Sequence, residues 1–427
     1  MISAKEGRPV RDNAENIAVS VVIPVYGVEK YLPACLDSVL SQTLSEIEII
    51  CIDDHSPDRC PEILDEYAET DKRITVIHEP ENRQQGYCRN RGIDAAKGKY
   101  IYLLDSDDMI TPSAMEELYR FAEEKELDGV FFDSQVIFDS PELAKKNASY
   151  PAKRKGNYPD NPVTGLELFE SFIEQGEWTC YIQRQFWNRD FLNREAVRFP
   201  EGVEHEDEVF SFEAILAAKK TMCISKEYFI RRYREDSVMT KPPAPRNFYG
   251  YFMDYFYMIE TVRKRDIRSE AAESNIGRLY EKLVRLYALF RDREDLASWF
   301  RTEQSRDLFA FFEYSQRGNA YYRSFASHVL SAVPKERGIY IYGAGIIARN
   351  LWHGLTQAGR IVKGFIVTER KNNPPALFGV PVCTVSEMKK DALKNGDIAV
   401  IAVSRGYADE IEKELDKREI EHIYYSE

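Results

Sequence analysis

The sequence predicts an α/β protein in which a doubly wound, mostly parallel sheet is followed by a helical region and a second, smaller α/β domain. Short apolar runs alternate with helical patterns through the first 115 residues, which is typical of parallel strands joined by crossover helices. Apolar residues at three- and four-residue spacing then dominate residues 246–333. A glycine turn between a strand and a helix opens the last part of the chain.

Four buried strands are expected in the first part of the chain. Each is a short run of β-branched, aliphatic or aromatic residues, as in strands that are covered on both faces. The expected strands are 18–26, 46–54, 74–78 and 99–104, and the helices between them are 28–42, 61–70 and 86–97. Further along, the pattern predicts strands at 128–138 and 228–234, a helix at 208–219 and a polar loop or insertion at 140–162.

Length, charge and cysteine content limit the class of protein. A chain of 427 residues holds two or three domains, and its net charge of −13 argues against nucleic acid as the main partner, because phosphate binding needs clustered Lys and Arg. Seven scattered cysteines without metal-binding spacing favour thiols in a reducing compartment. Residues 1–17 are polar and are expected to be a flexible segment without a secretory signal. We therefore expect a cytoplasmic protein, with peripheral contact to the inner face of a membrane as an alternative.

Carboxylates end two of the expected strands. Asp53 and Asp54 close the second strand, and Asp105 and Asp107 follow the fourth. Open parallel sheets bind ligands at the carboxyl ends of their strands, and two carboxylates two residues apart can share one divalent cation. The alternative is a solvated acidic turn or the cap of a helix that begins near Pro112.

Tyr26 ends the first strand, at the same edge of the sheet as Asp54. A planar ring beside a carboxylate suits a nucleobase, because the ring can stack on the base while the carboxylate accepts from a ring N–H. A metal at Asp105 and Asp107 would then suit a diphosphate. A core aromatic is the alternative for Tyr26.

These motifs resemble those of family 2 glycosyltransferases, which have the GT-A fold and transfer sugars from nucleotide sugars with inversion. The matching segments, in the order of the family, are VSVVIPVY at 19–26, SVLSQT at 38–43, IDDHS at 52–56, NRG at 90–92 with AKG at 96–98, and LDSDD at 104–108. The match covers about residues 18–115. The chain departs from the family at His55, where glycine is more common.

The resemblance implies roles for individual residues. Tyr26 and Asp54 would hold the base, Asp107 with Asp105 would hold Mn²⁺ or Mg²⁺, and Arg89 would lie near the diphosphate. The residues that we assign to nucleotide-sugar binding are Pro24, Tyr26, Asp53, Asp54, Arg89, Asp105 and Ser106.

The resemblance returns in an acceptor half over residues 116–240. In the family's pattern, the Asp of a Glu-Asp pair at this place is the catalytic base, which assigns Asp207 and makes Glu206 the second catalytic candidate. On the residues alone, these acids could instead complement the N-terminus of the helix that follows. Three basic residues near the end of this half could pair with a diphosphate or form a solvated edge: Arg231, Arg232 and Arg234.

Gly343 and Gly345 form the glycine turn of the last domain. The run from Gly338 to Ala348 has the Gly-x-Gly-x-x-Ala form of a dinucleotide fingerprint. Thr368 stands where a ribose-binding acid is expected, which weakens the case for NAD. The segment is similar to Rossmann-like domains of bacterial sugar acetyltransferases and of some capsule-type glycosyltransferases. Two readings stay open, a second nucleotide site at this turn and a structural or oligomerising module.

The sequence therefore predicts a GT-A domain at 18–240 with a nucleotide-sugar half at 18–115, a helical region at 246–333 and a Rossmann-like domain at 336–427. We expect an inverting, metal-dependent hexosyltransferase that uses a UDP-linked sugar. The expected acceptor is a saccharide or lipid-linked saccharide in bacterial surface polysaccharide or glycan biosynthesis.

Two other functions compete with this expectation. One is a nucleotide-sugar or NAD(P)-binding oxidoreductase or sensor centred on the C-terminal domain. The other is a GT-A module that binds its ligand without turnover. The C-terminal domain could also join the chain to a second copy of itself in a homo-oligomer. The aromatic residues of the helical region could contact a membrane, and packing in the protein core is the alternative for them.

Overall fold

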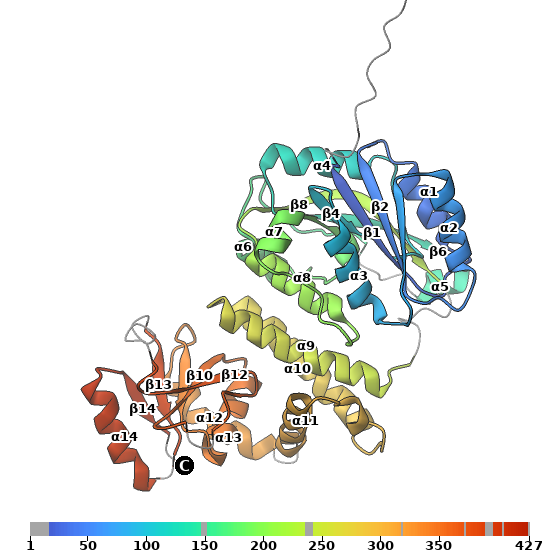
Figure 1. Cartoon of the computed structure of the whole chain (residues 1–427). Coiled ribbons are helices and arrows are strands. Elements are labelled where there is room, and N and C mark those ends of the chain that lie inside the picture. The colour runs from blue at the N-terminus through green and yellow to red at the C-terminus, as the bar shows by residue number, and fades with distance from the viewer. Residues whose placement is uncertain are drawn as a thin grey trace, which may run out of the picture. The chain divides into compact units, whose positions relative to one another are not determined.

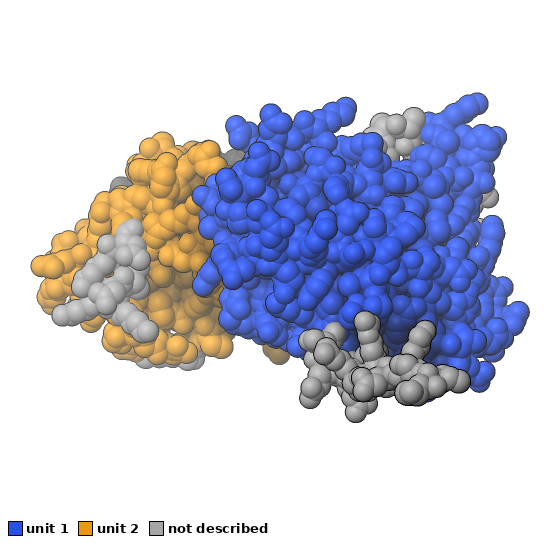
Figure 2. Space-filling model, turned by 90° about the horizontal axis from the view of Figure 1, so that it is seen from above, with its two compact units in different colours: residues 1–202, 206–241 blue, residues 203–205, 242–427 orange. Residues whose placement is uncertain are grey.

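The computed structural model describes residues 17–146, 152–234, 242–316, 319–370, 373–388, 396–403 and 405–425. The expected flexible segment 1–17 lies outside these residues except for its last residue. Contacts divide the chain into two compact units, which Figure 2 shows in two colours. Unit 1 is Met1–Gly202 with Glu206–Lys241, and unit 2 is Val203–His205 with Pro242–Glu427.

A mixed eight-stranded sheet forms the centre of unit 1 (Figure 1). Its strands lie in the order β3-β2-β1-β4-β7-β6-β8-β5. The first four of these strands are mutually parallel, as the alternation of strands and helices predicts. β7 is antiparallel to both β4 and β6, and β5 is antiparallel to β8. The strands are β1 (Val19–Val25), β2 (Ile47–Asp53), β3 (Ile74–His78), β4 (Tyr100–Leu103), β5 (Met109–Ile110), β6 (Gly129–Phe138), β7 (Gln185–Asn188) and β8 (Thr221–Tyr233).

Helices cover both faces of this sheet. α1, α2 and α4 bury Leu36, Leu64 and Leu118 against one face, together with alternate residues of β1 such as Val21. α3 packs on the other face, against Val22 of β1. The helices are α1 (Leu32–Leu40), α2 (Cys60–Thr70), α3 (Gln84–Ala95), α4 (Ala114–Lys125), α5 (Pro141–Lys146), α6 (Gly165–Glu174), α7 (Arg189–Arg194) and α8 (Glu206–Ala217), with a 3₁₀ turn at Ile182–Arg184.

Two local features differ from the sequence expectation. The region 140–162, expected as a polar loop, contains α5, which begins with Pro141 and carries Glu142 in its first turn. Both residues favour a helix start, although the polar composition of the region hides the signal. α3 begins at Gln84, two residues earlier than expected.

Unit 2 begins with helices, as the spacing of apolar residues in 246–333 predicts. α9 and α10 pack along each other, and Phe248 and Phe252 of α9 contact the aromatic residues Phe300 and Phe312. The helices are α9 (Pro245–Lys264), α10 (Glu270–Phe290), α11 (Glu303–Gln316) and α12 (Asn319–Ala332), with a 3₁₀ turn at Ala297–Trp299.

A second sheet completes unit 2 (Figure 1). Its strands lie in the order β11-β12-β10-β9-β13-β14. All neighbouring strands are parallel except β11 with β12. α12 and α13 bury Val329 and Leu351 on one face, and α14 buries Leu415 on the other. The elements are β9 (Ile339–Tyr342), α13 (Ile346–Gln357), β10 (Val362–Val367), β11 (Ala376–Leu377), β12 (Val380–Thr384), β13 (Ile398–Ile401), α14 (Arg405–Lys417) and β14 (His422–Tyr424).

The predicted fold class is therefore confirmed: a mostly parallel sheet, a helical region and a second, smaller α/β sheet follow one another along the chain. No disulfide joins the seven cysteines, all of which lie in the described ranges. Among the helices that the structure describes, none combines the length and the apolar character that crossing a membrane requires.

Candidate active site

The carboxyl ends of β1, β2 and β4 meet at one edge of the sheet in unit 1. Val25 is paired with Asp53, and Val22 is paired with Leu103, so the residues that follow these strands lie beside one another. Tyr26 follows β1 directly and is 50% exposed. The edge therefore presents an aromatic ring beside the acids that follow β2 and β4.

The acids at the end of β2 are buried and hydrogen-bonded within the protein. Asp54 accepts hydrogen bonds from the backbone amides of Arg83 at 2.6 Å and Gln84 at 2.9 Å, which fixes the start of α3. Burial raises the pKa of the Asp54 carboxyl, and these amides oppose the rise. Asp53 accepts from the amide of Ser56 at 3.1 Å and lies 3.0 Å from Nδ1 of His78. Both acids hold the loops of the edge in place.

Two other predicted residues are inside the edge. Pro24 is buried within β1, opposite Ile52 of β2. Ser106 is buried in the turn after β4. Both residues are buried below the surface of the edge, whereas the side chain of Tyr26 is exposed on it.

Arg89 connects the turn after β4 to the start of α8. The guanidinium is buried; its Nη2 donates to Oδ1 of Asp105 at 2.8 Å, and its Nη1 donates to Oε1 of Glu206. Burial alone would lower the pKa of Arg89, but the charges of Asp105 and Glu206 outweigh it and raise the pKa. This bridge joins Asp105 to Glu206, which is 117 residues from Arg89 in the chain, and so brings Glu206 and Asp207 to the edge that carries Asp105.

Asp207 lies in the first turn of α8, next to Glu206. Burial raises the pKa of its carboxyl to about 7, and the neighbouring carboxylates of Glu206 and Glu208 add to the rise, while Arg89 opposes it. The thiol of Cys180 lies 3.6 Å from Oδ2. A carboxyl with a pKa near neutrality suits proton transfer at the pH of a cell.

The acids after β4 have different environments. Oδ2 of Asp107 accepts a hydrogen bond from Nε of Arg234 at 2.7 Å, and Oδ1 of Asp108 accepts from the backbone amide of Arg232 at 2.7 Å. Burial raises the pKa of both carboxyls, and Asp105 raises it further. Asp108 is buried and supports the turn, whereas Asp107 is partly exposed.

At the expected metal site, the protein would supply two carboxylates, those of Asp105 and Asp107. Within the described ranges, no group of three or more His, Cys, Asp or Glu side chains could hold a metal ion. Both oxygens of Asp105 accept hydrogen bonds, one from Arg89 and one from Nε2 of Gln183 at 2.6 Å. Asp107 is partly exposed, and its carboxylate already pairs with the guanidinium of Arg234. It therefore suits a cation whose other ligands come from a bound diphosphate.

Sequence reasoning missed Gln183 and Cys180. Gln183 lies in the 3₁₀ turn before β7, and Cys180 lies just before that turn. β7 pairs antiparallel with β4, and this pairing brings the segment to the edge. No motif or spacing in the sequence marks either residue.

Two non-glycine residues near the edge have left-handed backbone angles: His55 (φ 59°) and Gln84 (φ 70°). Such conformations are costly for residues with a Cβ, and they are frequent at functional sites. For His55, the angle gives a reason why glycine is common at this place in the family that the sequence resembles.

The glycine turn of unit 2 lies where the strand order reverses, between β9 and β13. Gly343 has φ 123°, and a Cβ there would lie 2.7 Å from the carbonyl oxygen of Ala402, so backbone geometry requires this glycine. Gly345 is exposed with open space around it. Thr368 hydrogen-bonds to the hydroxyl of Tyr342 at 3.1 Å. A second nucleotide site at Gly343 and Gly345 stays a prediction.

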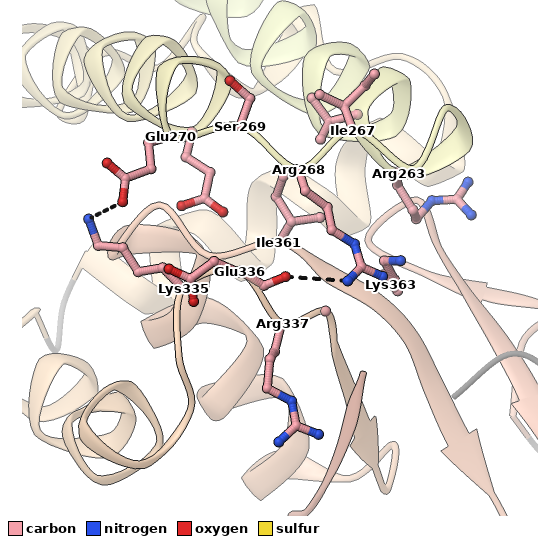
Figure 3. Close-up of a pocket in the computed structure, with 13 residues that line it drawn as sticks. Arg263, Ile267, Arg268, Ser269, Glu270, Lys335, Glu336, Arg337, Ile361 and Lys363 are labelled. Atoms are coloured by element: carbon pink, nitrogen blue, oxygen red, sulfur yellow. Dashed lines mark hydrogen bonds and ion pairs between the residues drawn. The ribbon is translucent and has the colours of Figure 1, made fainter. Parts of the chain in front are cut away.

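A pocket in unit 2 lies at the opposite edge of this sheet, by Gly338 before β9 and Lys363 in β10 (Figure 3). Its volume of about 90 Å³ is below the roughly 300 Å³ at which small-molecule sites begin. Several of its charges are paired within the protein: Lys335 lies 3.5 Å from Glu270, and Arg268 donates to Asp397 at 2.8 Å. The pocket therefore offers little to a ligand.

The strand order of unit 1, with acids at its edge, is that of a GT-A glycosyltransferase, and comparisons with known proteins agree. Residues 20–178 match the family described as Glycosyl transferase family 2. The glycosyltransferase GlyG of Streptococcus pneumoniae is 31% identical over 234 residues, which cover 52% of this chain and 72% of GlyG. The chain belongs to glycosyltransferase family 2.

Other relatives are matched over part of their length. Two glycosyltransferases of Bacillus subtilis, 32% and 34% identical, are each covered over 64% of their length. A poly(ribitol-phosphate) beta-glucosyltransferase of Bacillus spizizenii is 30% identical over 294 residues, which cover 66% of this chain and 44% of that enzyme. The crystal structure of S. aureus TarS 1–349 in complex with UDP is 18% identical with a TM-score of 0.52, covering 80% of this chain and 90% of TarS 1–349. That likeness shows the fold.

Proposed function

We propose that the chain is an inverting glycosyltransferase that moves a hexose-type sugar from a UDP-linked donor to a hydroxyl group of a bacterial surface polymer. The catalytic domain would be residues 18–240, followed by the helical region 246–333 and the Rossmann-like domain 336–427. UDP is favoured because TarS, which shares the fold, was solved with it. A polyol or saccharide acceptor is favoured by the poly(ribitol-phosphate) glucosyltransferase among the relatives.

The donor would lie along the edge of unit 1. The exposed ring of Tyr26 offers a surface on which a uracil can stack, and Asp54 would accept from the base in addition to holding α3. Arg234, which donates a hydrogen bond to Asp107, would also pair with the diphosphate. A divalent cation, when bound by Asp107 with Asp105 beside it, supplies the charge that stabilises the departing phosphate oxygens.

The bridge made by Arg89 is the observation that carries this proposal. It ties Asp105, beside the donor residues, to Glu206, the neighbour of Asp207. In an inverting transfer, the acceptor oxygen attacks the anomeric carbon while the bond to the diphosphate breaks. Asp207 would take the proton of the attacking hydroxyl, and its pKa of about 7 suits that role. Glu206 is paired with Arg89, so we assign it to positioning.

The proposal is tested with the purified chain and a panel of nucleotide sugars, with Mn²⁺ or Mg²⁺, by measuring nucleotide release with and without polyol or saccharide acceptors. Asp207→Asn should lower kcat by about 10²–10⁴ while UDP binding is retained. Asp107→Asn should lose the metal dependence of UDP binding. Asp190→Asn, at an exposed position on α7, is the control and should behave like the unmodified chain.

Three outcomes would contradict the proposal. A folded Asp207→Asn protein with normal turnover would exclude Asp207 as the base. Hydride transfer from or to NAD(P) that depends on Gly345 would favour the oxidoreductase alternative. Tight UDP binding without turnover for any donor and acceptor would favour a binding module.

A further inference from the structure

The segment before β7 is hydrogen-bonded to α8, within unit 1. Oγ of Ser211, on α8, donates a hydrogen bond to the backbone carbonyl of Cys180 at 2.9 Å. Nε2 of Gln185, the first residue of β7, donates to Oγ of Ser211 at 2.9 Å and to the carbonyl of Tyr181 at 3.3 Å. The backbone of residues 180 and 181 is therefore held by a helix and by a strand.

The side chains of this network are buried and hydrogen-bond to one another. Gln185 is 1% exposed and Ser211 is fully buried. Oε1 of Gln185 accepts a hydrogen bond from Nε1 of Trp187 at 3.1 Å, so both ends of the amide have a partner. Buried polar groups that are hydrogen-bonded in this way give a segment a well-defined position, because breaking such a bond leaves a costly unpaired group. The network therefore specifies where Cys180 lies.

The thiol of Cys180 contacts Asp207. Asp207 and Ser211 are four residues apart on α8, so their side chains lie on the same face of the helix. The carbonyl of Cys180 meets Ser211, and its Sγ donates to Oδ2 of Asp207 at 3.6 Å. Oδ1 of Asp207 accepts from the backbone amide of Glu208 at 3.1 Å. Both oxygens of the carboxylate thus accept a hydrogen bond, and the thiol supplies the one that comes from outside α8.

The thiol acts on the charged form of Asp207. Burial and the carboxylates of Glu206, Glu208 and Asp105 raise the pKa of this carboxyl, and Arg89 opposes the rise. A hydrogen bond donated to a carboxylate favours its ionised form, which is the form that a general base needs. A thiol is a weak donor, so we expect a modest effect on ionisation together with a fixed orientation of the carboxylate.

We propose that Cys180 is a positioning residue of the active site, whose thiol, set by Ser211 and Gln185, holds the ionised carboxylate of Asp207 towards the acceptor hydroxyl. The inference rests on the proposed role of Asp207 as the base. Cys180 forms no bond to the substrate in this role. Its contribution is the orientation of the group that takes the proton, and orientation of this kind is a recognised source of rate enhancement.

The experiment compares Cys180→Ala with Cys383→Ala in the full chain. Cys383, in β12, is also partly exposed, and its thiol donates to the carbonyl of Phe365 at 3.5 Å, so the two changes remove the same atoms and a similar hydrogen bond. We expect Cys180→Ala to lower kcat by about 3- to 10-fold, with unchanged UDP affinity. Cys383→Ala should keep the kcat of the unmodified chain.

The pH profile separates this role from simple packing. In Cys180→Ala, the pH at which kcat/KM reaches half of its plateau should rise by about 0.5 unit, because the ionised carboxylate has lost a donor. Cys180→Ser keeps a donor and should restore most of the rate and of the midpoint. A Cys180→Ser protein as slow as Cys180→Ala would exclude the hydrogen bond as the cause.

Ser211→Ala tests the network behind the thiol and covers the case in which Cys180→Ala fails to fold. It keeps Cys180 but removes the hydroxyl that holds its carbonyl, so kcat should fall in the same direction. If folded Cys180→Ala or, in its absence, folded Ser211→Ala matches Cys383→Ala in kcat and in pH midpoint, the inference is wrong. Normal turnover by Asp207→Asn would instead overturn the proposed function, so the two failures are distinguishable.

Discussion

Nε of Arg234 donates a hydrogen bond to Oδ2 of Asp107 at 2.7 Å. Arg234, the residue that follows β8, thus places a positive charge beside Asp107, the acid that we propose as a metal ligand. A divalent cation and this guanidinium compete for one carboxylate. Metal affinity at this edge should therefore depend on Arg234.

We predict that Arg234→Gln binds Mn²⁺ more tightly than the unmodified chain when no nucleotide is present, by about 3- to 10-fold, because the competing charge is removed. Titration followed by the electron paramagnetic resonance signal of free Mn²⁺ measures the change. Lys226→Gln is the control, since Lys226 lies on β8, the strand that Arg234 follows, but is paired with Glu117. Equal or weaker Mn²⁺ binding by Arg234→Gln would contradict the prediction.

The pKa of Asp207 predicts the acid limb of the pH profile. A base must be ionised to accept a proton, and this carboxyl ionises at about pH 7. We expect kcat/KM to rise with pH and to reach half of its plateau near pH 7. Initial rates between pH 5 and pH 9, with the pH stability of the protein checked in parallel, test this. A rate that stays constant down to pH 5 would exclude a base with this pKa.

The same pKa predicts a gain of stability in Asp207→Asn. The pKa of Asp207 rises from its ordinary value of 3.8 to about 7 in the folded protein, so folding favours the protonated form. This contribution is present below about pH 4 and is lost as the pH rises through 7. At pH 8, Asp207→Asn should therefore melt at least about 2 °C higher than the unmodified chain, and the difference should vanish towards pH 4. A constant difference across this range would point to another cause.

Arg89 should be needed for stability as well as for position. Arg89→Met leaves Asp105 and Glu206 without their shared buried cation, and we expect a loss of about 3–5 kcal/mol in the free energy of unfolding. Denaturant unfolding measures this loss. Adding Glu206→Gln should recover part of it, because one buried charge is then removed.

Arg59→Met provides the reference for the change at Arg89. Arg59 is exposed and lies 3.9 Å from the exposed Glu66, and such surface pairs contribute at most about 1 kcal/mol. If Arg89→Met costs no more than Arg59→Met, Arg89 does not hold the edge together.

The backbone at His55 predicts a stabilising substitution. Its φ of 59° is unfavourable for a residue with a Cβ, and its side chain is exposed. His55→Gly should stabilise the protein by about 0.5–1 kcal/mol, measured by thermal unfolding. Lys72→Gly is the control: this exposed turn residue is not among those with positive φ, so glycine there should destabilise slightly. Matching losses in both variants would show that the backbone at His55 carries no strain.

Much of the fold follows from local pattern. The alternation of apolar runs and helical spacing predicts β1 to β4 as parallel strands, and parallel strands must end at one edge, which brings Tyr26, Asp54 and Asp107 into one region. The antiparallel insertion of β7 between β4 and β6 is not predicted, because strand partners are chosen by long-range packing. That insertion brings Gln183 to Asp105 and Cys180 to Asp207.

The sequence by itself determined which residue types end each strand and where helices and strands alternate, because these features depend on near neighbours in the chain. Tertiary structure decided how those residues are used. Arg89 became the bridge between Asp105 and Glu206 through contacts between residues 16 to more than 100 positions apart. Burial in the folded protein also raised the pKa of Asp207, and solvent exclusion of this kind cannot be read from a linear chain.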